Sequence, residues 1–270
     1  MPISSADANR VVRSLHYSHR VVNNSQLHLG VFLDGKCGGA MQFGPPLDKR
    51  KMIGLVTGTG WNDFLELNRL AFADWLPRNS ESRALAFAFR WMRKTYPHLK
   101  WIVSFADGTQ CGDGAIYRAS GFVLTQIKKN NQIWEAPTGE VFCDTSIRPG
   151  IGGEKTRQRA KEVVARVTAT KGGHILDNGA SSMKAFKEAG WKPKAGYQFR
   201  YIYFLDPAAR SKLAVPIIPF SQIAQIGAGM YKGEKCVRGV AGDTPGLQPG
   251  NGGSNPTRTL DQNPADEGRS

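Results

Sequence analysis

Asp107 combines a reactive carboxyl group with a setting that suits catalysis. It follows the apolar run Trp101–Ala106, which predicts a buried strand, and a glycine-rich loop comes next. Ligands of open α/β sheets bind beyond the carboxyl ends of strands, so Asp107 could act as a general base or a metal ligand. An aspartate that merely caps a turn would leave the same pattern.

Tyr117 lies ten residues further on, late in a short helix predicted over residues 114–120. A phenol has an ordinary pKa of about 10, which suits a group that protonates a departing thiolate. The alternative is a packed aromatic ring whose hydroxyl lies at the surface.

A histidine-rich motif, His16-Tyr17-Ser18-His19, follows the first predicted helix. Two histidines this close could ligate a metal or act as acid and base. They lack a His-x-x-x-His spacing, and surface histidines would give the same pattern. The four cysteines of the chain are far apart and form no Cys-x-x-Cys pair, which argues against a zinc cluster or a disulfide framework.

The start of the longest predicted helix, over residues 79–96, could bind an anion. Asn79 or Ser80 suits an N-cap, and the free amides of a first helical turn attract negative charge. Arg78 and Arg83 flank this turn, so the arrangement would suit the pyrophosphate of CoA or of a nucleotide. An ordinary capped helix with two solvated arginines is the alternative, since the turn contains no glycine.

These side chains need elements to position them, and the chain alternates strand-like and helix-like segments. Helices are predicted over residues 4–15, 79–96, 114–120, 154–169 and 181–189, and strands over residues 28–33, 39–43, 65–73, 101–106, 122–127, 133–136 and 197–205. Asp34-Gly35 predicts a tight hairpin between the first two strands. This order predicts an α/β or α+β fold with a mixed central sheet flanked by helices, followed by a C-terminal extension of helix and strand.

Length and charge limit the kind of protein and its partners. The chain has 270 residues and a formal net charge of +14, which favours an anionic partner such as nucleic acid, a membrane surface or a polyphosphate. A generally basic protein without such a partner is the alternative. The sequence has neither an apolar run of membrane-spanning length nor a hydrophobic signal segment, so we expect a cytoplasmic protein.

Three regions are predicted along the chain: a catalytic core over residues 1–150, a basic extension packed on it over residues 151–238, and a disordered tail over residues 239–270. The tail is rich in glycine and proline and poor in large apolar residues. The predicted helix of the extension carries candidate contacts to the DNA backbone: Lys155, Arg157, Arg159, Lys161 and Arg166. A solvated helix face would look the same.

Several motifs, in order, resemble the Mom family of phage and prophage DNA-modification proteins. The motifs are FLELNRLAF at 64–72, PRNSES at 77–82, SFAD at 104–107 and GAIYRASGF at 114–122, together with His16-Tyr17-Ser18 and the strand at 28–32. The likeness runs over residues 10 to 145, with looser similarity at 200–207 and 217–233. Several ordered motifs are far more specific than any one of them.

The resemblance implies a divergent GNAT-type acyltransferase fold, with acetyl-CoA between the fourth and fifth strands of that fold and its pyrophosphate at the following helix. By position, it implies a cofactor site made from Arg69, Leu70, Phe72, Arg78, Asn79, Ser80, Ser82 and Arg83. It implies a reacting centre at Asp107 and Tyr117, approached by His16 and Tyr17, and iron held by His16, Tyr17 and Asp107. The phosphate turn departs from the usual GNAT pattern because it lacks glycine.

The resemblance also implies a product, N6-carbamoylmethyl (acetamido) adenine, which hides phage DNA from restriction enzymes. The target nitrogen is paired inside double-stranded DNA, so we expect the adenine to be flipped out, and a homodimer is compatible with the sequence. Plain acetyl transfer would give an N-acetyl group instead, so a further chemical step is needed. The alternatives are a GNAT N-acetyltransferase for a protein, a tRNA or a small amine, and a basic DNA-binding protein without catalysis.

Overall fold

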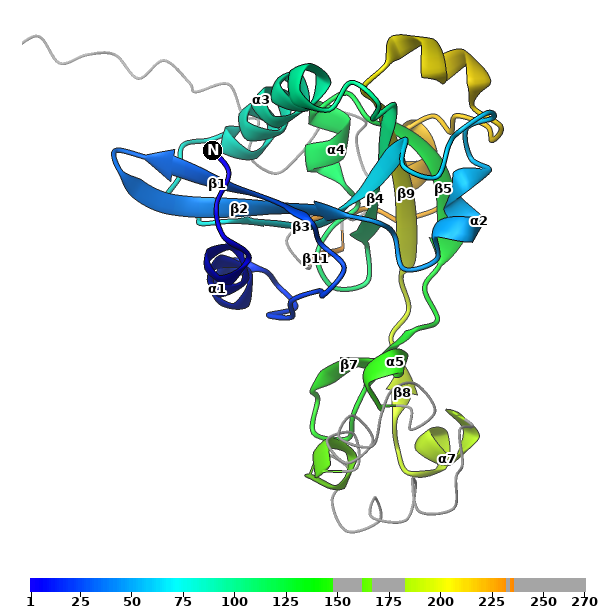
Figure 1. The fold of residues 1–270 in the computed structure, drawn as a ribbon. Coiled ribbons are helices and arrows are strands. Elements are labelled where there is room, and N and C mark those ends of the chain that lie inside the picture. The colour runs from blue at the N-terminus through cyan, green and yellow to red at the C-terminus, as the bar shows by residue number, and fades with distance from the viewer. Residues whose placement is uncertain (148–161, 167–182, 232–233, 236–270) are drawn as a thin grey trace, which may run out of the picture. The chain divides into compact units, whose positions relative to one another are not determined.

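A computed structural model describes residues 1–147, 162–166, 183–231 and 234–235. Its main feature is a six-stranded sheet in the order β1-β2-β3-β4-β9-β5 (Figure 1). The strands are β1 (Leu27–Leu33), β2 (Lys36–Gly44), β3 (Phe64–Phe72), β4 (Trp101–Asp107), β5 (Val123–Lys129) and β9 (Tyr197–Phe204). β3 and β4 are parallel and the other neighbours are antiparallel. The predicted α/β fold with a mixed central sheet is confirmed.

Helices and short strands complete the described structure. The helices are α1 (Ser5–Leu15), α2 (Lys49–Ile53), α3 (Ser80–Thr95), α4 (Ala115–Ala119), α5 (Asp144–Ile147), α7 (Met183–Glu188), α8 (Ser221–Gln225) and the 3-10 helix η2 (Pro207–Lys212). The short strands are β6 (Ile133–Glu135), β7 (Val141–Cys143), β8 (Lys192–Pro193), β10 (Met230–Tyr231) and β11 (Glu234–Lys235). Among these described helices, none combines the length and the apolar character needed to span a membrane.

Local sequence explains the first elements. Ser4 is the N-cap of α1, and its Oγ accepts a hydrogen bond from the backbone N–H of Asp7 at 3.1 Å. Asp34 and Gly35 both have positive φ angles, 50° and 76°, as a two-residue turn between twisted antiparallel strands requires. The predicted hairpin and first helix therefore form where the sequence indicated.

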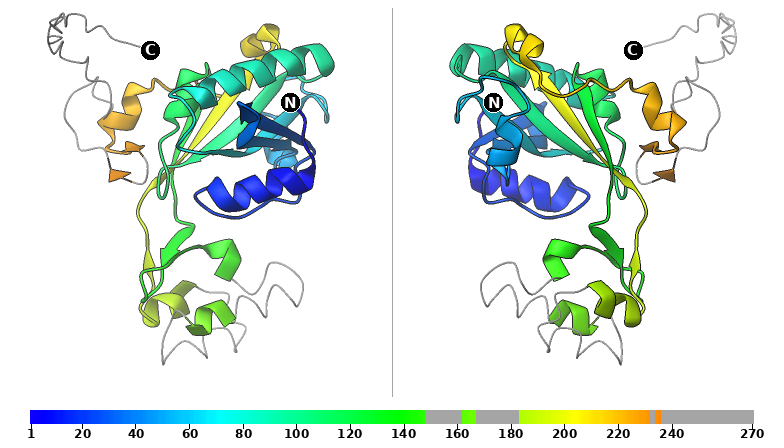
Figure 2. Two further views of the ribbon diagram at one scale, coloured as in Figure 1. Left: turned by 90° about the vertical axis from the view of Figure 1, so that its left-hand side faces the viewer. Right: turned by 90° about the vertical axis from the view of Figure 1, so that its right-hand side faces the viewer.

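Helices cover both faces of the sheet. α3 lies on one face, where Leu85, Phe89 and Met92 are fully buried, and α1 lies on the other, where it buries Ala8 and Val12 (Figures 1 and 2). α1 contacts β2 and β3. The loop that follows α1 therefore starts from the face opposite α3, beside the middle of the sheet.

The parallel pair β3 and β4 separates partway along its length. Pairing joins the first three residues of each strand, from Phe64 opposite Trp101 to Glu66 opposite Val103. The side chains of Phe64 and Trp101 stack at 4.2 Å between ring centroids and hold this end together. The rest of β3 pairs with β2 alone, which leaves backbone groups of β3 available on the β4 side.

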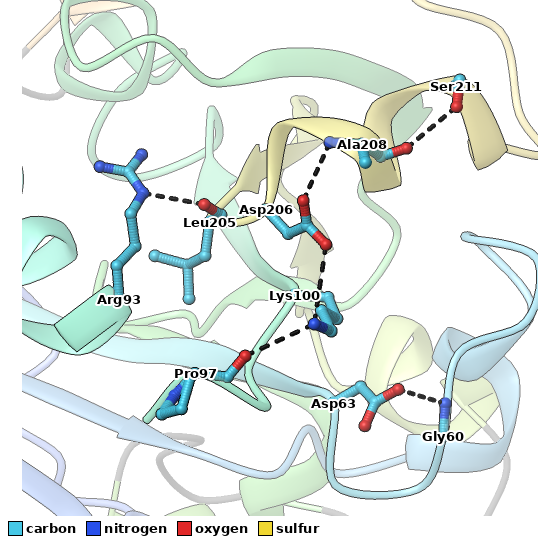
Figure 3. Close-up of polar contacts among 9 residues, drawn as sticks. All are labelled: Gly60, Asp63, Arg93, Pro97, Lys100, Leu205, Asp206, Ala208 and Ser211. Atoms are coloured by element: carbon cyan, nitrogen blue, oxygen red, sulfur yellow. Dashed lines mark hydrogen bonds and ion pairs between the residues drawn. The ribbon is translucent and has the colours of Figure 1, made fainter. Parts of the chain in front are cut away.

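Polar contacts brace the amino ends of these two strands (Figure 3). The Asp63 carboxylate accepts a hydrogen bond from the Gly60 N–H at 2.8 Å, just before β3 begins. Lys100 lies 3.6 Å from the Asp206 carboxylate, and Arg93 of α3 donates to the carbonyl of Leu205 at 2.8 Å. The paired end is thus tied to η2 and α3, and the strands diverge toward their carboxyl ends.

The region after residue 150 contributes directly to the main sheet. β9 lies between β4 and β5, so its residues form the middle of the sheet, whereas the sequence predicted an extension packed on a finished core. The segment between β5 and β9 forms a separate three-stranded sheet, β7-β6-β8, with an apolar cluster of its own. Of the helix predicted over residues 154–169, only residues 162–166 are described, and they are helical.

Candidate active site

Side chains from several distant segments meet where β3 and β4 separate. Tyr17, in the loop after α1, interacts electrostatically with Asp107 at the end of β4, with Arg69 on β3 and with Tyr117 on α4. Tyr117 in turn interacts with Glu66 and with Arg69. The four predicted positions Tyr17, Arg69, Asp107 and Tyr117 therefore lie together, although they are far apart in the sequence.

A β-bulge in β3 explains why Glu66 and Arg69 both belong to this cluster. Phe43 of β2 pairs with Leu67 and Gln42 pairs with Arg69, so Asn68 is an extra residue in β3. A bulge of this kind interrupts the alternation of side chains between the two faces. Glu66 and Arg69, three residues apart, therefore both lie on the face away from α3.

Arg69 ties the loop after α1 to the sheet. Its Nε donates to the carbonyl oxygen of Arg20 at 2.9 Å, and its Nη1 donates to the carbonyl of Asn68 at 2.7 Å. Burial lowers the pKa of the guanidinium, while interactions with Tyr17 and Glu66 oppose that shift. Arg69 therefore positions the segment that carries Tyr17 and places a positive charge in the cluster.

The two tyrosines are held as neutral phenols. Burial raises the pKa of Tyr117 to about 12, and a hydrogen bond with Ser104 partly opposes the shift. Partial burial also raises the pKa of Tyr17, although 44% of the residue is exposed, and the negative charge of Asp107 adds to the effect. The Ser104 hydroxyl donates to the Leu67 carbonyl at 3.2 Å, across the separation between the strands. Neutral phenols of this kind donate protons and do not accept them.

Asp107 both caps a turn and faces the cluster. Its Oδ1 accepts hydrogen bonds from the Thr109 N–H at 2.9 Å and from Asn130 Nδ2 at 3.2 Å, and its Oδ2 accepts from Gln110 Nε2 at 2.9 Å. Three donors fix the orientation of the carboxylate. The two interpretations of this residue from the sequence, turn cap and site carboxylate, are therefore compatible.

Glu66 is a member of the cluster that the sequence did not reveal. Burial raises its pKa to about 7, against the opposing effects of a hydrogen bond with Asn68 and the charge of Arg69. A carboxyl group that ionises near neutral pH is well suited to accept a proton. The signal available in the sequence was a charged residue inside the apolar strand FLELNRLAF.

The structure gives no support to the predicted iron site at His16, Tyr17 and Asp107. Burial lowers the pKa of His16 to about 3, and its Nδ1 accepts a hydrogen bond from the Ser18 N–H at 3.2 Å. Tyr17 is a neutral phenol, and both Asp107 oxygens already accept hydrogen bonds. Within the described residues, no group of three histidine, cysteine, aspartate or glutamate side chains could hold a metal. The iron expectation therefore gains no support.

The start of α3 differs in detail from the predicted cap. Asn79 has a left-handed backbone, φ 66°, and no side-chain oxygen accepts from the first-turn amides. Instead, the Ser80 hydroxyl donates to the Pro77 carbonyl at 2.6 Å and the Ser82 hydroxyl donates to the Asn79 carbonyl at 3.1 Å. The Ser80 N–H donates to the Pro77 carbonyl at 3.1 Å, and no side chain caps the amides of Glu81 and Ser82, which is compatible with an incoming anion.

The other predicted cofactor residues lie on the α3 side of the sheet or at the start of α3, whereas Arg69 lies on the opposite face. Leu70 and Phe72 pack against the apolar core on the α3 side. Arg78 and Arg83 are exposed at the start of α3. A cavity of about 460 Å³ is lined by Pro77, Ser80 and Arg83 together with residues of β1, but neither Asp107 nor Tyr117 lines it.

Of the predicted DNA contacts, Arg166 is among the residues that the structure describes. Lys155, Arg157, Arg159 and Lys161 lie outside the described residues. Arg166 is described and exposed, and it donates two hydrogen bonds to the Glu140 carboxylate at 2.7 and 2.8 Å. The charge of Arg166 is thus paired within the protein.

Comparisons with known proteins identify relatives of this chain. A family model described as the Mom protein family matches residues 1–222. The methylcarbamoylase Mom of Escherichia phage Mu is 43% identical over 116 residues, which cover 43% of this chain and 48% of that protein. The match thus spans about half the length of this curated relative.

Solved structures with a similar arrangement are GNAT proteins. A GNAT-family acetyltransferase from Streptococcus pneumoniae matches with a TM-score of 0.34 and 15% identity, covering 48% of this chain and 86% of that one. A tandem GNAT protein from the clavulanic acid biosynthesis pathway matches with a TM-score of 0.41 and 9% identity, covering 77% of this chain and 98% of that one.

Proposed function

Because this chain belongs to the Mom protein family, we propose that it modifies adenine bases in phage DNA, using acetyl-CoA to form N6-carbamoylmethyl adenine. The phage Mu relative is named a methylcarbamoylase, in line with such a product. The observation that carries the proposal is the meeting of Tyr17, Glu66, Asp107 and Tyr117 at the separation of β3 and β4. The modified DNA would resist host restriction enzymes in the cytoplasm of the infected cell.

The residues around the separated strands fit the cofactor. Residues 69–72 of β3 have a strand partner on one side, and their backbone groups on the β4 side could hydrogen-bond to the amide-rich arm of acetyl-CoA. The uncapped first turn of α3, with Ser80 and exposed Arg83, could hold its phosphates. When bound, acetyl-CoA supplies the two-carbon unit of the product.

The chemical balance shows which proton transfers are needed. In the product, adenine N6 would be bonded to the carbon that was the methyl group of the acetyl unit, and an amide nitrogen would stand in place of the sulfur. Adenine, acetyl-CoA and ammonia thus yield the product, CoA thiol and two hydrogen atoms. A nitrogen donor and a two-electron acceptor must therefore act as co-reactants.

The protein's own groups match the proton transfers in this balance. Glu66, with a pKa near 7, can accept the proton that leaves N6. Tyr117, a neutral phenol beside Ser104, can donate a proton to the departing sulfur. Asp107 and Arg69 provide the fixed negative and positive charges around the reacting groups.

DNA is the proposed substrate because the chain is strongly basic and the reaction needs an accessible adenine. The net charge of +14 favours association with the phosphate backbone. The N6 group is paired in duplex DNA, so the base must leave the stack before it can react, at a cost of a few kcal/mol.

The test is mass spectrometry of nucleosides from plasmid DNA isolated after expression of the full chain. We expect a deoxyadenosine species heavier by one carbamoylmethyl group, and we expect Tyr117→Phe to reduce it. Tyr96→Phe is the matched control, because Tyr96 packs edge-on against Trp91, away from the cluster. Unmodified DNA together with acetylation of protein, tRNA or amines would establish the N-acetyltransferase alternative instead.

A further inference from the structure

We infer that the sheet face beside Asp107 holds a phosphate of the DNA strand that carries the target adenine, through Arg200 on β9 and Lys128 on β5. This inference rests on the proposed function, because DNA is the partner. Neither residue belongs to the cluster around Tyr17, and both lie on strands that continue the sheet past β4.

Strand register places both residues next to the site. Across β4, β9 and β5, one row of direct partners consists of Asp107, Gln198 and Lys128, and the adjoining row consists of Phe105, Arg200 and Gln126. Directly opposed residues of antiparallel strands point to the same face of a sheet. Arg200 is therefore two residues, about 7 Å, along β9 from the row that contains Asp107.

Arg200 is a buried cation with only neutral hydrogen-bond partners. It is 8% exposed, and it donates from Nε to Thr125 Oγ1 at 3.0 Å and from Nη2 to the Thr125 carbonyl at 3.4 Å. Among the described residues, no carboxylate lies within ion-pair distance of it. Burial lowers the pKa of Arg200, and no nearby anion opposes that shift. A buried charge without an ion-pair partner raises the free energy of the folded protein, so an external anion would stabilise Arg200.

Two other partly buried arginines, Arg118 and Arg69, have acidic partners within the protein. Arg118 forms an ion pair with Asp113 at 2.8 Å, and Arg69 interacts with Glu66. Among these buried and partly buried arginines within the described residues, Arg200 differs by lacking an anion. A guanidinium has five N–H donors in a planar fork, so after its two bonds to Thr125 it can still donate to a phosphate.

The surroundings of Arg200 favour a strand of DNA over a single small anion. Lys128 ends the neighbouring row, is exposed, and has no ion-pair partner among the described residues. The half-buried amides of Gln126 and Gln198 can donate to phosphate oxygens as well. Two cations and two amides thus lie side by side, next to Asp107, which matches a backbone that must pass the site when its base is flipped.

A purely structural role is the competing explanation, since Arg200 bonds to the bulge at Thr125. The test is the salt dependence of DNA binding, because each phosphate contact that is lost lowers the slope of log K against log salt by about 0.9. The probe is a labelled duplex with one adenine opposite an abasic site, measured with the full chain. We expect a slope reduction of about 0.9 for Arg200→Gln and for Lys128→Gln, and of about 1.8 for both together.

Two control variants and a measurement of acetyl-CoA affinity separate a phosphate contact from other effects of the substitutions. Arg93→Gln should leave the slope unchanged, because Arg93 also donates to neutral oxygens but from α3, on the other face. Arg200→Lys keeps the charge and should retain most of the slope. Acetyl-CoA affinity should stay the same in Arg200→Gln and Lys128→Gln.

Other results would overturn either the phosphate site or the proposed function, and they can be told apart. Weaker binding with an unchanged salt slope would show that Arg200 acts only as a structural bond and would overturn the inference. Loss of acetyl-CoA affinity with unaltered DNA binding would overturn it too, since the phosphate would then be the cofactor's. If the wild-type chain does not bind the duplex at all, the proposed function itself fails, and this outcome is distinct from wild-type binding with unaltered slopes in the variants.

Discussion

Replacing Glu66 with glutamine should make the protein more stable and less active. The pKa of Glu66 is raised from 4.5 to about 7 by burial, so the folded state holds a proton that the unfolded chain has already released. Stability therefore falls as pH rises from about 4.5 to about 7 and stays lower above that range. Glutamine resembles the protonated acid in shape and does not titrate, so the variant escapes this loss.

The size of the effect follows from the pKa shift. One pKa unit corresponds to about 1.4 kcal/mol, so the shift of Glu66 corresponds to an upper limit of about 3 kcal/mol at pH 8 and less than about 1 kcal/mol at pH 5. For a chain of this length each kcal/mol changes the melting temperature by roughly 2–4 °C. Glu66→Gln should therefore melt roughly 6–12 °C higher than the wild type at pH 8, with a much smaller difference at pH 5.

Melting temperatures at pH 5 and pH 8, together with the nucleoside assay of activity, test this prediction. Glu135→Gln is the control, because Glu135 is exposed on β6 and should alter neither stability nor activity. We expect Glu66→Gln to lose most of its modification activity, since its amide cannot accept the proton from N6. Equal melting temperatures of variant and wild type at pH 8, or a difference that does not depend on pH, would refute the reasoning.

Three further predictions test the rest of the account. Tyr117→Phe should lower modification about a hundredfold or more in the nucleoside assay while thermal melting changes little, because the ring still packs against Phe122 and Tyr201; a variant with normal activity would exclude Tyr117 as the acid. Met92→Ala, under α3, should cost about 2–5 kcal/mol in denaturant unfolding, because the side chain is fully buried. Acetyl-CoA at a hundred times its dissociation constant should stabilise the wild type by about 2.7 kcal/mol, as read from its melting temperature, and no shift would argue against cofactor binding.

The sequence predicted elements well where local chemistry decides them. The cap at Ser4, the turn at Asp34-Gly35 and the apolar run that becomes β4 are all short-range signals. The identities of Tyr17, Arg69, Asp107 and Tyr117 came from motifs that resemble a family, and their meeting in space depends on how β3 and β4 pair. Pairing between distant strands cannot be read from local pattern.

Two features depend on tertiary structure and could not be predicted locally. β9 reads as an aromatic-rich strand, but its place between β4 and β5 follows from long-range pairing of residues about a hundred positions apart. Glu66 reads as one charge in a strand, and its raised pKa arises only because the folded sheet buries it. Bulges such as that at Asn68, which decide which face a side chain occupies, leave no clear local signal either.

The most direct test of the account is a crystal structure of the full chain with acetyl-CoA bound. We expect the thioester between β3 and β4, with its acetyl group in contact with Glu66 and Tyr117 and its phosphates at the first turn of α3. A thioester bound instead in the apolar cavity between β1 and α3, which is lined by Phe32 and Phe87, would contradict it.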